Sequence, residues 1–443
     1  AAATLLQVLA GVAPAAVPCA RIEDWPDARF RVADWLLNAE INRWGLERGD
    51  GSAALFARME RHLDLAARLK LNVVWFDGFG WDPDRAPGYA AFVRRLATRA
   101  RERHIRLAHA GYGGGYGFAY QKHFIYESPY YGRISENRTS YPDGPTYDCV
   151  GHPGYAASWR FGTCLSNQAL AERKLAELTE FVRQCQPGML YIHDIDTGDF
   201  PLAWEGWKRR CPACRERWPD DAMVSATGGA AAYAHWYRQA AAAINQVSAE
   251  DDSYVAARDC EIVFVGPVYT AAHDAEDIWR QECDYFALVS ELMGPFPNVQ
   301  FGIREQVVPT ATGGSRTALL KERLQRAGQG HGVLVVAFVG GDNYFSDTLV
   351  PAGATLQGCY EGADTAYTKN IGAVAEPAQA VCAEYAWNGA APGALNVPPD
   401  RQGALDLLWC CQKGRVIPPG WQEPDGAVAR ACELLYGTAA APA

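Results

Sequence analysis

The segment that ends the apolar run Met189–Ile192 carries a histidine and closely spaced carboxylates, in the sequence YIHDIDTGD. Asp194 and Asp196 are two residues apart, so an extended backbone directs both carboxylates to one side and His193 to the other. Crowded carboxylates repel each other and raise the pKa of one of them, which leaves a protonated acid beside an ionised base near neutral pH. The pair predicts general acid–base chemistry. The structural alternative is an Asp-Thr-Gly turn in which Asp196 caps its own backbone.

Polar or aromatic residues also end the other apolar runs, which core packing alone does not produce. In a barrel of parallel strands, such residues project from the carboxyl ends of the strands into a common site. His109 has a second interpretation, as a structural histidine whose ring is satisfied by protein groups. We expect the following residues to bind substrate around Asp194 and Asp196: Arg31, Asp77, His109, Tyr112, His193, Trp204, Tyr269, Glu305, Asp342 and Tyr344.

Seven short apolar runs predict the strands that position these side chains. An eighth strand has two candidates, Ala354–Tyr360 and Val381–Trp387. The seven predicted strands are Phe30–Leu37, Leu71–Asp77, Ile105–Ala110, Met189–Asp196, Glu261–Tyr269, Val299–Glu305 and Gly332–Gly340. Amphipathic periodicity predicts helices at Ala53–Lys70, Gly88–Arg103, Ala169–Gln184, Ala230–Val247, Gln402–Gln412 and Ala427–Tyr436.

This alternation predicts an α/β fold with a parallel sheet, and room for eight units favours a (β/α)8 TIM barrel over an open sheet. An open nucleotide-binding sheet is disfavoured because no Gly-x-Gly-x-x-Gly follows the first strand. Long insertions are expected after the third and fourth strands, at 111–166 and 197–228, and such loops are usually functional. We expect residues 30–443 to form the catalytic barrel, and residues 1–29 to be a connector from a missing or truncated N-terminal domain.

The composition is that of a globular protein, with 49% hydrophobic and 21% charged residues. The net charge of −10 disfavours partners such as nucleic acids or an anionic membrane surface, and no apolar run is long enough for a transmembrane helix. The 14 Trp residues exceed what a core needs, and flat aromatic rings suit the faces of sugars, whereas a large core with aromatic loop anchors is the alternative interpretation. We therefore expect an oligosaccharide or glycoconjugate substrate, and no cofactor.

The 13 cysteines include one Cys-x-x-Cys pair, Cys211 and Cys214, in the second insertion. A structural zinc site needs two further ligands, for which Cys149, His152 and Cys164 of the preceding insertion are candidates. A disulfide and unpaired thiols are the alternatives. No other metal is expected, and the cysteine count leaves the redox compartment open.

Several of these segments together resemble glycoside hydrolase family 20, the β-N-acetylhexosaminidases. The opening TLLQVL…VPCARIEDWPDARFR is similar to the segment that joins that family's small N-terminal domain to its barrel, which implies that Arg31 binds the sugar. The segment LKLNVVWFDGFGW is similar to the family's second-strand motif, with Asp77 at the motif position. The resemblance runs in barrel order across nearly the whole chain. It favours a secreted or periplasmic enzyme, although a cytoplasmic location stays open.

The fourth strand departs from that family, whose motif is His-x-Gly-Gly-Asp-Glu, because the sequence after His193 contains no Asp-Glu pair. It is similar to the Asp-Asp-Ile strand of family 84, with His193 in place of the first aspartate. The C-terminal EYAWN resembles both families, which implies that Trp387 and Asn388 belong to the sugar pocket.

Both families imply hydrolysis of terminal β-linked N-acetylhexosamine (GlcNAc or GalNAc) by substrate-assisted, retaining catalysis. The substrate's 2-acetamido oxygen attacks the anomeric carbon and forms an oxazolinium ion. One carboxylate orients the acetamido N–H, the other protonates the leaving oxygen, and Tyr269 or Tyr344 binds the acetamido carbonyl. The identity of the acid stays open. It is Asp194 in the family 84 register, whereas a shifted family 20 register selects Asp196 or Asp199.

Two other functions stay open on the sequence. The first is a retaining glycosidase with an enzyme carboxylate such as Glu305 as its nucleophile. The second is a carbohydrate-binding barrel that has lost its acid, an alternative raised by the missing Asp-Glu pair.

Overall fold

The computed structural model describes residues 26, 29–36, 52–76, 88–112, 165–166, 168–193, 204, 207–208, 210, 212–270, 276–304, 316–335 and 365–369. Residues 1–25, most of the expected connector, lie outside the described residues. So do the two helices expected near the C-terminus and both segments expected to supply the eighth strand.

Eight parallel strands form one sheet in the described part of the chain, in the order β7-β6-β5-β4-β3-β2-β1-β8. All seven apolar runs supply strands, so the predicted α/β fold with a parallel sheet is confirmed. The strands are β1 (Phe30–Leu36), β2 (Val73–Phe76), β3 (Arg106–Tyr112), β4 (Met189–His193), β5 (Glu261–Thr270), β6 (Val299–Arg304), β7 (Gly332–Val335) and β8 (Thr365–Lys369).

The eighth strand corrects the sequence-based expectation, because neither Ala354–Tyr360 nor Val381–Trp387 supplies it. Strand β8 pairs with β1 in parallel, from Phe30 opposite Thr365 to Asp34 opposite Lys369. Its sequence, TAYTK, has no apolar run of the kind that marks a strand buried on both faces.

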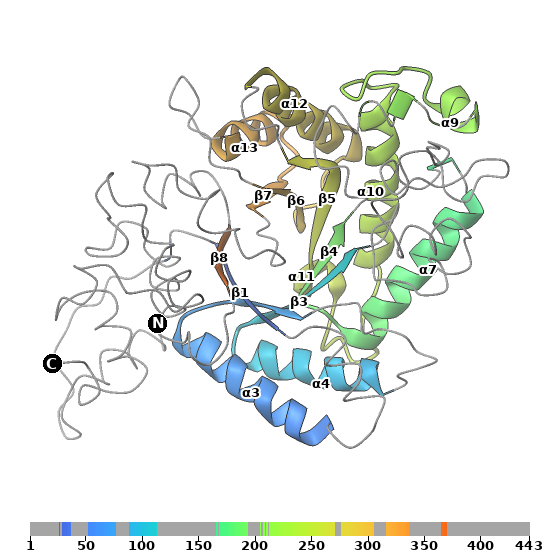
Figure 1. Ribbon diagram of the computed structural model, residues 1–443. Coiled ribbons are helices and arrows are strands. Elements are labelled where there is room, and N and C mark those ends of the chain that lie inside the picture. Colours follow the sequence, from blue (N-terminus) through green and yellow to red (C-terminus); the bar gives the residue numbers. More distant parts are fainter. Residues whose placement is uncertain are drawn as a thin grey trace, which may run out of the picture.

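Helices connect most of these strands and contact one another in chain order. Figure 1 shows them arranged around the sheet. They are α3 (Ser52–Arg68), α4 (Tyr89–Glu102), α7 (Gln168–Cys185), α10 (Gly229–Asn245), α12 (Glu276–Met293) and α13 (Arg316–Ala327), with two short helices, α9 (Pro212–Arg217) and α11 (Ala256–Asp259). In α3, for example, Phe56, Met59, Leu63 and Ala66 recur at helical spacing and are all buried.

The strands bury their two faces in two separate apolar clusters. Along β4, Met189 and Tyr191 belong to one cluster, whereas Leu190 and Ile192 belong to the other. This is the alternation that a pleated strand imposes. The larger cluster also contains the buried faces of the helices, so it is the layer between sheet and helices. The smaller, interior cluster consists of Phe30, Val32, Val73, Ala108, Met189, Tyr191, Val263, Val265 and Leu334.

The interior cluster shows that the sheet is strongly curved. It joins side chains of β1, near one edge of the sheet, to Leu334 of β7 at the other edge. Strands β7 and β8, the two edges, also have Cα atoms within 8 Å of each other. A parallel sheet that brings its edges together in this way has the curvature of a barrel.

A polar group closes the amino-terminal end of this interior. The Glu261 carboxylate, 5% exposed, accepts hydrogen bonds from the Arg29 guanidinium at 2.8 Å and from Gln300 Nε2 at 3.1 Å. Arg106 lies 3.7 Å away on the same carboxylate. These four residues lie at or next to the first residues of β1, β3, β5 and β6. The cluster therefore lies at the amino-terminal end of the sheet, opposite the carboxyl ends of the strands.

In the described part of the chain, none of the helices combines the length and the apolar character that crossing a bilayer requires.

Candidate functional site

The carboxyl ends of β3 and β4 lie side by side in the middle of the sheet. His193, the last residue of β4, is the register partner of Tyr112 on β3 and of Val265 on β5. The structure therefore brings Tyr112 and His193, two of the expected substrate-binding residues, to neighbouring positions at the strand ends. Active sites of parallel barrels occupy this end of the sheet.

A second pair of expected residues comes together at the ends of β5 and β6. Thr270 pairs with Arg304 across these strands. Tyr269 precedes Thr270 and Glu305 follows Arg304, so both expected residues are sequence neighbours of a paired position.

Apolar side chains fill the interior below these ends. Tyr191, 1% exposed, is an interior residue close to the carboxyl end of β4, and the fully buried Val265 of β5 is the register partner of His193. Sequence reasoning did not single out Tyr191, although its two-residue spacing from Met189 and His193 was the available signal. Tyr191 is the residue that places a polar hydroxyl in an otherwise apolar interior cluster.

Much of the expected site lies outside the residues that the structure describes. For Tyr112, His193 and Tyr269 the backbone is described and the side chain is not. The expected residues outside the described ranges are Asp77, Asp194, Asp196, Glu305, Asp342, Tyr344, Trp387 and Asn388.

Arg31 is at the wrong end of the sheet for the sugar-binding role expected from its sequence context. Its Nε donates to the Lys70 carbonyl at 2.8 Å, and its backbone N–H donates to Asn72 Oδ1 at 2.7 Å. Lys70 and Asn72 precede β2, so these bonds hold Arg31 at the amino-terminal end. Burial lowers the pKa of Arg31 to about 10, and the side chain serves to join β1 to the turn before β2.

His109 also lies away from the strand ends, in the middle of β3. Its ring is fully buried, and the ring centroids of Phe76 and Phe181 are 5.6 and 5.1 Å from its own. Both rings belong to the layer between sheet and helices, so His109 faces away from the interior. Among the described residues neither ring nitrogen has a hydrogen-bond partner, so the ring is not satisfied by protein groups as the second interpretation expected, and burial lowers the pKa of His109 to about 3. A ring enclosed in this layer cannot reach a ligand at the strand ends.

Trp204 anchors the insertion that follows β4. Its indole N–H donates to the Asp221 carbonyl at 3.0 Å, and Lys208 Nζ lies 4.9 Å from the ring centroid. Its ring also packs against the sheet–helix core. Stacking of a sugar on Trp204 stays a prediction.

The Cys-x-x-Cys pair is described at one position only. Cys214, in α9, is buried and its Sγ lies 3.2 Å from Ser166 Oγ, whereas Cys211 lies outside the described residues. Among the described residues, no three side chains of the metal-ligating types converge on one point. Zinc binding by this pair stays a prediction.

Comparison with known proteins gives matches among solved structures alone. No family model matches the sequence, and no curated protein does. An O-GlcNAc hydrolase of Thermobaculum terrenum aligns over 93% of this chain at 9% identity and a TM-score of 0.44. A β-N-acetylhexosaminidase aligns over 83% of this chain and 74% of its own, at 12% identity and a TM-score of 0.43.

A family 20 exo-β-N-acetylglucosaminidase of Vibrio harveyi aligns over 89% of this chain and 60% of its own, at 11% identity and a TM-score of 0.39. This chain spans 64% of the length of the Thermobaculum enzyme. At identities and TM-scores this low, the inferences that follow rest on the residues of this chain.

Proposed function

We propose that this chain is a glycoside hydrolase that cleaves terminal β-linked N-acetylhexosamine, with its catalytic carboxylates in the segment after β4. The observation that supports this most directly is the position of His193, which ends a central strand between Tyr112 and Val265. The acidic sequence Asp194-Ile-Asp196 continues from this point. A site here would collect side chains from several neighbouring strand ends.

The fold that we propose for this activity is a closed (β/α)8 barrel formed by residues 30–443. The approach of β7 to β8 and the single interior cluster support closure. The interior is filled with side chains, as in barrels whose catalytic groups stand above a packed core. The insertions after β3 and β4 would then flank the substrate.

In the proposed mechanism, Asp194 and Asp196 divide two tasks. One carboxylate accepts a hydrogen bond from the substrate's acetamido N–H, which directs the acetamido oxygen to the anomeric carbon. The other begins protonated and transfers its proton to the leaving glycosidic oxygen. It then removes a proton from the water that opens the oxazolinium ion, so the enzyme returns to its starting state. Close carboxylates titrate at separated pH values, which suits this division.

The proposal places one condition on the backbone after β4. Met189 and Tyr191 face the interior, whereas Ile192 faces the layer between sheet and helices. If the side chains of a straight strand kept alternating, the one at position 193 would face the interior and the one at position 194 would face the helices. For Asp194 and Asp196 to face a substrate above the barrel, the chain has to turn after His193. The Asp196-Thr-Gly sequence that follows is rich in turn-forming residues.

The remaining expected residues complete a proposed pocket. Tyr269 or Tyr344 would bind the acetamido carbonyl, and Trp387 would support the apolar face of the sugar. Arg31 and His109 are left out because their positions exclude them. The proposed ligands of the sugar hydroxyls are Asp77, Tyr112, His193, Glu305, Asp342 and Asn388.

Hydrolysis of 4-nitrophenyl N-acetylglucosaminide, with and without a thiazoline mimic of the oxazolinium ion, tests the proposal. We expect turnover that the thiazoline inhibits, because the mimic occupies the site of the cyclised acetamido group. Binding of the thiazoline without turnover would instead identify a carbohydrate-binding barrel. Turnover of the plain 4-nitrophenyl glucoside, unaffected by the thiazoline, would identify a glycosidase with an enzyme nucleophile such as Glu305. No turnover and no binding would refute the assignment to carbohydrates.

A further inference from the structure

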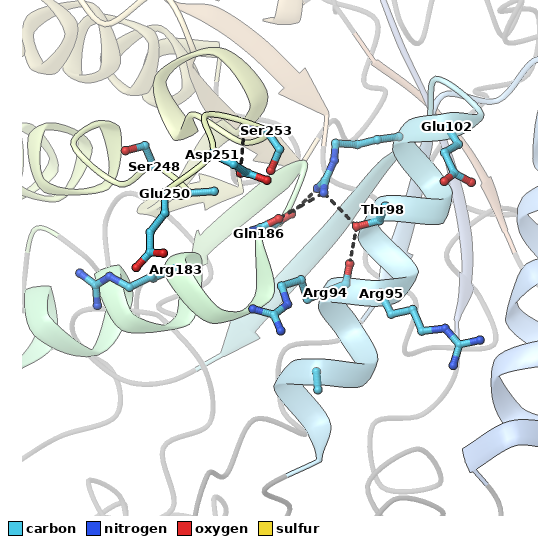
Figure 2. Close-up of a pocket in the computed structure, with 13 residues that line it drawn as sticks. Arg94, Arg95, Thr98, Glu102, Arg183, Gln186, Ser248, Glu250, Asp251 and Ser253 are labelled. Carbon is cyan, nitrogen blue, oxygen red and sulfur yellow. Dashed lines mark hydrogen bonds between the residues drawn. The ribbon is translucent and has the colours of Figure 1, made fainter.

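A cleft of about 910 Å³ opens at the amino-terminal end of the sheet (Figure 2). It lies between α4, the end of α7 and the turn at residues 248–253, which an isolated bridge between Ser248 and Val255 closes. These three segments lead into β3, β4 and β5. The cleft is therefore separate from the proposed catalytic site, which lies at the opposite ends of the same strands.

One wall of the cleft is basic, although the whole chain carries a net charge of −10. Arg94, Arg95 and Arg101 of α4 and Arg183 of α7 line it. Arg95 stacks on the Phe56 ring, with 3.9 Å between guanidinium carbon and centroid, and Arg183 pairs with Glu180. Arg94 is exposed, and its guanidinium makes no hydrogen bond or ion pair with any described residue. Arg94 is therefore the charge on this wall that is ready for a ligand.

The helix that carries Arg94 is held firmly in place. The Arg101 guanidinium donates to the Gln186 carbonyl at 3.0 Å, to Gln186 Oε1 at 3.2 Å and to Thr98 Oγ1 at 3.1 Å. The two bonds to Gln186 tie α4 to the turn after α7, and the bond to Thr98 lies within α4. A ligand bound by Arg94 would meet a preorganised wall, which lowers the entropic cost of binding.

The opposite wall offers hydroxyl groups and carboxylates. Ser248 and Ser253 supply the hydroxyls, and Asp251 accepts a hydrogen bond from the Ser253 backbone N–H at 3.1 Å. Glu250 is the other carboxylate on this wall, and it accepts no hydrogen bond from a described residue. Figure 2 shows that no drawn hydrogen bond reaches the carboxylate of Glu250 or the guanidinium of Arg94.

We propose that this cleft binds the anionic group of an acidic saccharide, a sugar carboxylate or sulfate, through Arg94. A guanidinium can donate two parallel hydrogen bonds to either anion. Arg183 adds positive charge beside it, and the serine hydroxyls suit the neutral hydroxyls of the sugar. The volume is within the range of small-ligand sites. The saccharide part rests on the proposed function, whereas the anionic group rests on the cleft alone.

Calorimetric titration of the full chain with three probes tests the proposal. The probes are a trigalacturonate, a sulfated N-acetylglucosamine disaccharide and neutral chitotriose, each titrated with excess thiazoline present to occupy the proposed catalytic site. Arg94→Gln and Glu250→Gln are the test variants. Arg326→Gln removes the same charge from an exposed position on α13, outside the cleft, and is the control.

We expect at least one acidic probe to bind and chitotriose not to bind, with affinity falling as salt is raised. Arg94→Gln should weaken binding by about tenfold, as expected for loss of a charge-assisted pair. Glu250→Gln should tighten binding about two- to threefold, because it removes a charge that repels the anion. Arg326→Gln should bind like the wild type. The preference between the two acidic probes distinguishes carboxylate from sulfate.

Failure of both acidic probes to bind overturns the proposal, as does unchanged binding by Arg94→Gln or equal binding of chitotriose. Weaker binding by Glu250→Gln also overturns it, because that result means the ligand is cationic at this position. The nitrophenyl assay reports on the proposed function separately, so the two proposals can fail independently.

Discussion

His193, the last residue of β4, is the register partner of Tyr112, the last residue of β3, so these two central strands end at the same level. Strand β4 has three sequential neighbours on one side, β3, β2 and β1, and three on the other, β5, β6 and β7. The end of β4 therefore lies among several strand ends, and Asp194 is the next residue in the sequence.

We predict that Asp194→Asn and Asp196→Asn each lower kcat/KM by about 10²–10⁴, the usual contribution of a positioned acid or base. Substrates with a good and a poor leaving group separate the two roles. The variant without the acid should lose far more activity on the poor leaving group, which needs the proton. The variant without the acetamido ligand should lose activity on both. Asp277→Asn, at an exposed position of α12, is the control. Near-normal activity in both test variants would contradict the assignment.

The sequence predicted the sheet better than it predicted the site. Strands buried on both faces appear as apolar runs, so seven of eight could be located. Strand β8 has no such run, because TAYTK mixes threonine, tyrosine and lysine. Helices α12 and α13 were not predicted, although apolar residues of α12 such as Phe286, Val289 and Met293 recur at helical spacing and are buried.

The two corrected site residues were misplaced for a different reason. A polar residue in an apolar run can face the interior, the helices or the end of the sheet, and the run itself does not tell which. The position of the Arg31 side chain is determined by its bonds to the turn before β2. The direction of the His109 side chain follows from strand alternation, which places it on the same face of β3 as Leu107, in the layer between sheet and helices. Both depend on which residues the neighbouring strand supplies, information that a single strand does not contain.

We predict that His109 makes the protein less stable in mild acid. Its pKa is about 3 in the folded protein against 6.5 for a free histidine, so as pH falls the unfolded chain takes up the proton first. The free energy of unfolding should thus be unaffected above pH 6.5 and should fall between pH 6.5 and 3. The loss is about 1.4 kcal/mol per pH unit, or about 2 kcal/mol at pH 5. Burial lowers the pKa of His331 to about 4, so this histidine adds a second loss of stability over much of the same pH range.

Urea unfolding at pH 5 to 8 measures this effect. In His109→Leu the free energy of unfolding should fall about half as steeply with decreasing pH. At pH 8 the substitution should cost little stability, because it removes two buried nitrogens that have no hydrogen-bond partner among the described residues. The control is His104→Asn, at an exposed position with φ of 56°, a backbone conformation that asparagine tolerates. An acid slope that is unchanged in His109→Leu would show that the His109 ring is protonated in the folded state.

We predict that Glu261→Gln destabilises the fold without affecting catalysis. The substitution leaves the charges of Arg29 and Arg106 without their carboxylate at a largely buried position. Removal of one partner of a fully buried pair costs about 3–5 kcal/mol. Both arginines are partly exposed, so solvent screening reduces the expected loss to about 2 kcal/mol.

Chemical denaturation measures the loss, with Glu291→Gln on the exposed face of α12 as a control that should change stability by less than about 0.5 kcal/mol. The Glu261 group lies at the end of the sheet opposite the proposed catalytic site, so KM for the nitrophenyl substrate should stay unchanged. An increase in KM with no loss of stability would mean that this end of the sheet contributes to the substrate site.

We predict that Arg210 holds the insertion after β4 in shape. Its side chain is 2% exposed, and its Nε and one terminal nitrogen donate to the Trp218 carbonyl at 3.1 and 2.9 Å. The other terminal nitrogen donates to the Trp207 carbonyl at 3.0 Å and to Asp221 Oδ1 at 2.6 Å. One planar guanidinium thus joins three points of the insertion, a geometry that the single ammonium of lysine cannot reproduce.

Arg210→Lys should therefore open the insertion locally. We expect amide exchange in residues 212–221 to increase by about tenfold or more, which corresponds to a local loss of at least about 1.4 kcal/mol, while exchange in β4 and β5 stays slow. Arg217→Lys, an exposed arginine of the same insertion that stacks on Trp218, is the matched control and should leave exchange unchanged. Because this insertion follows the proposed catalytic segment, Arg210→Lys should also raise KM for the nitrophenyl substrate. Faster exchange with an unchanged KM would place the insertion outside the substrate site.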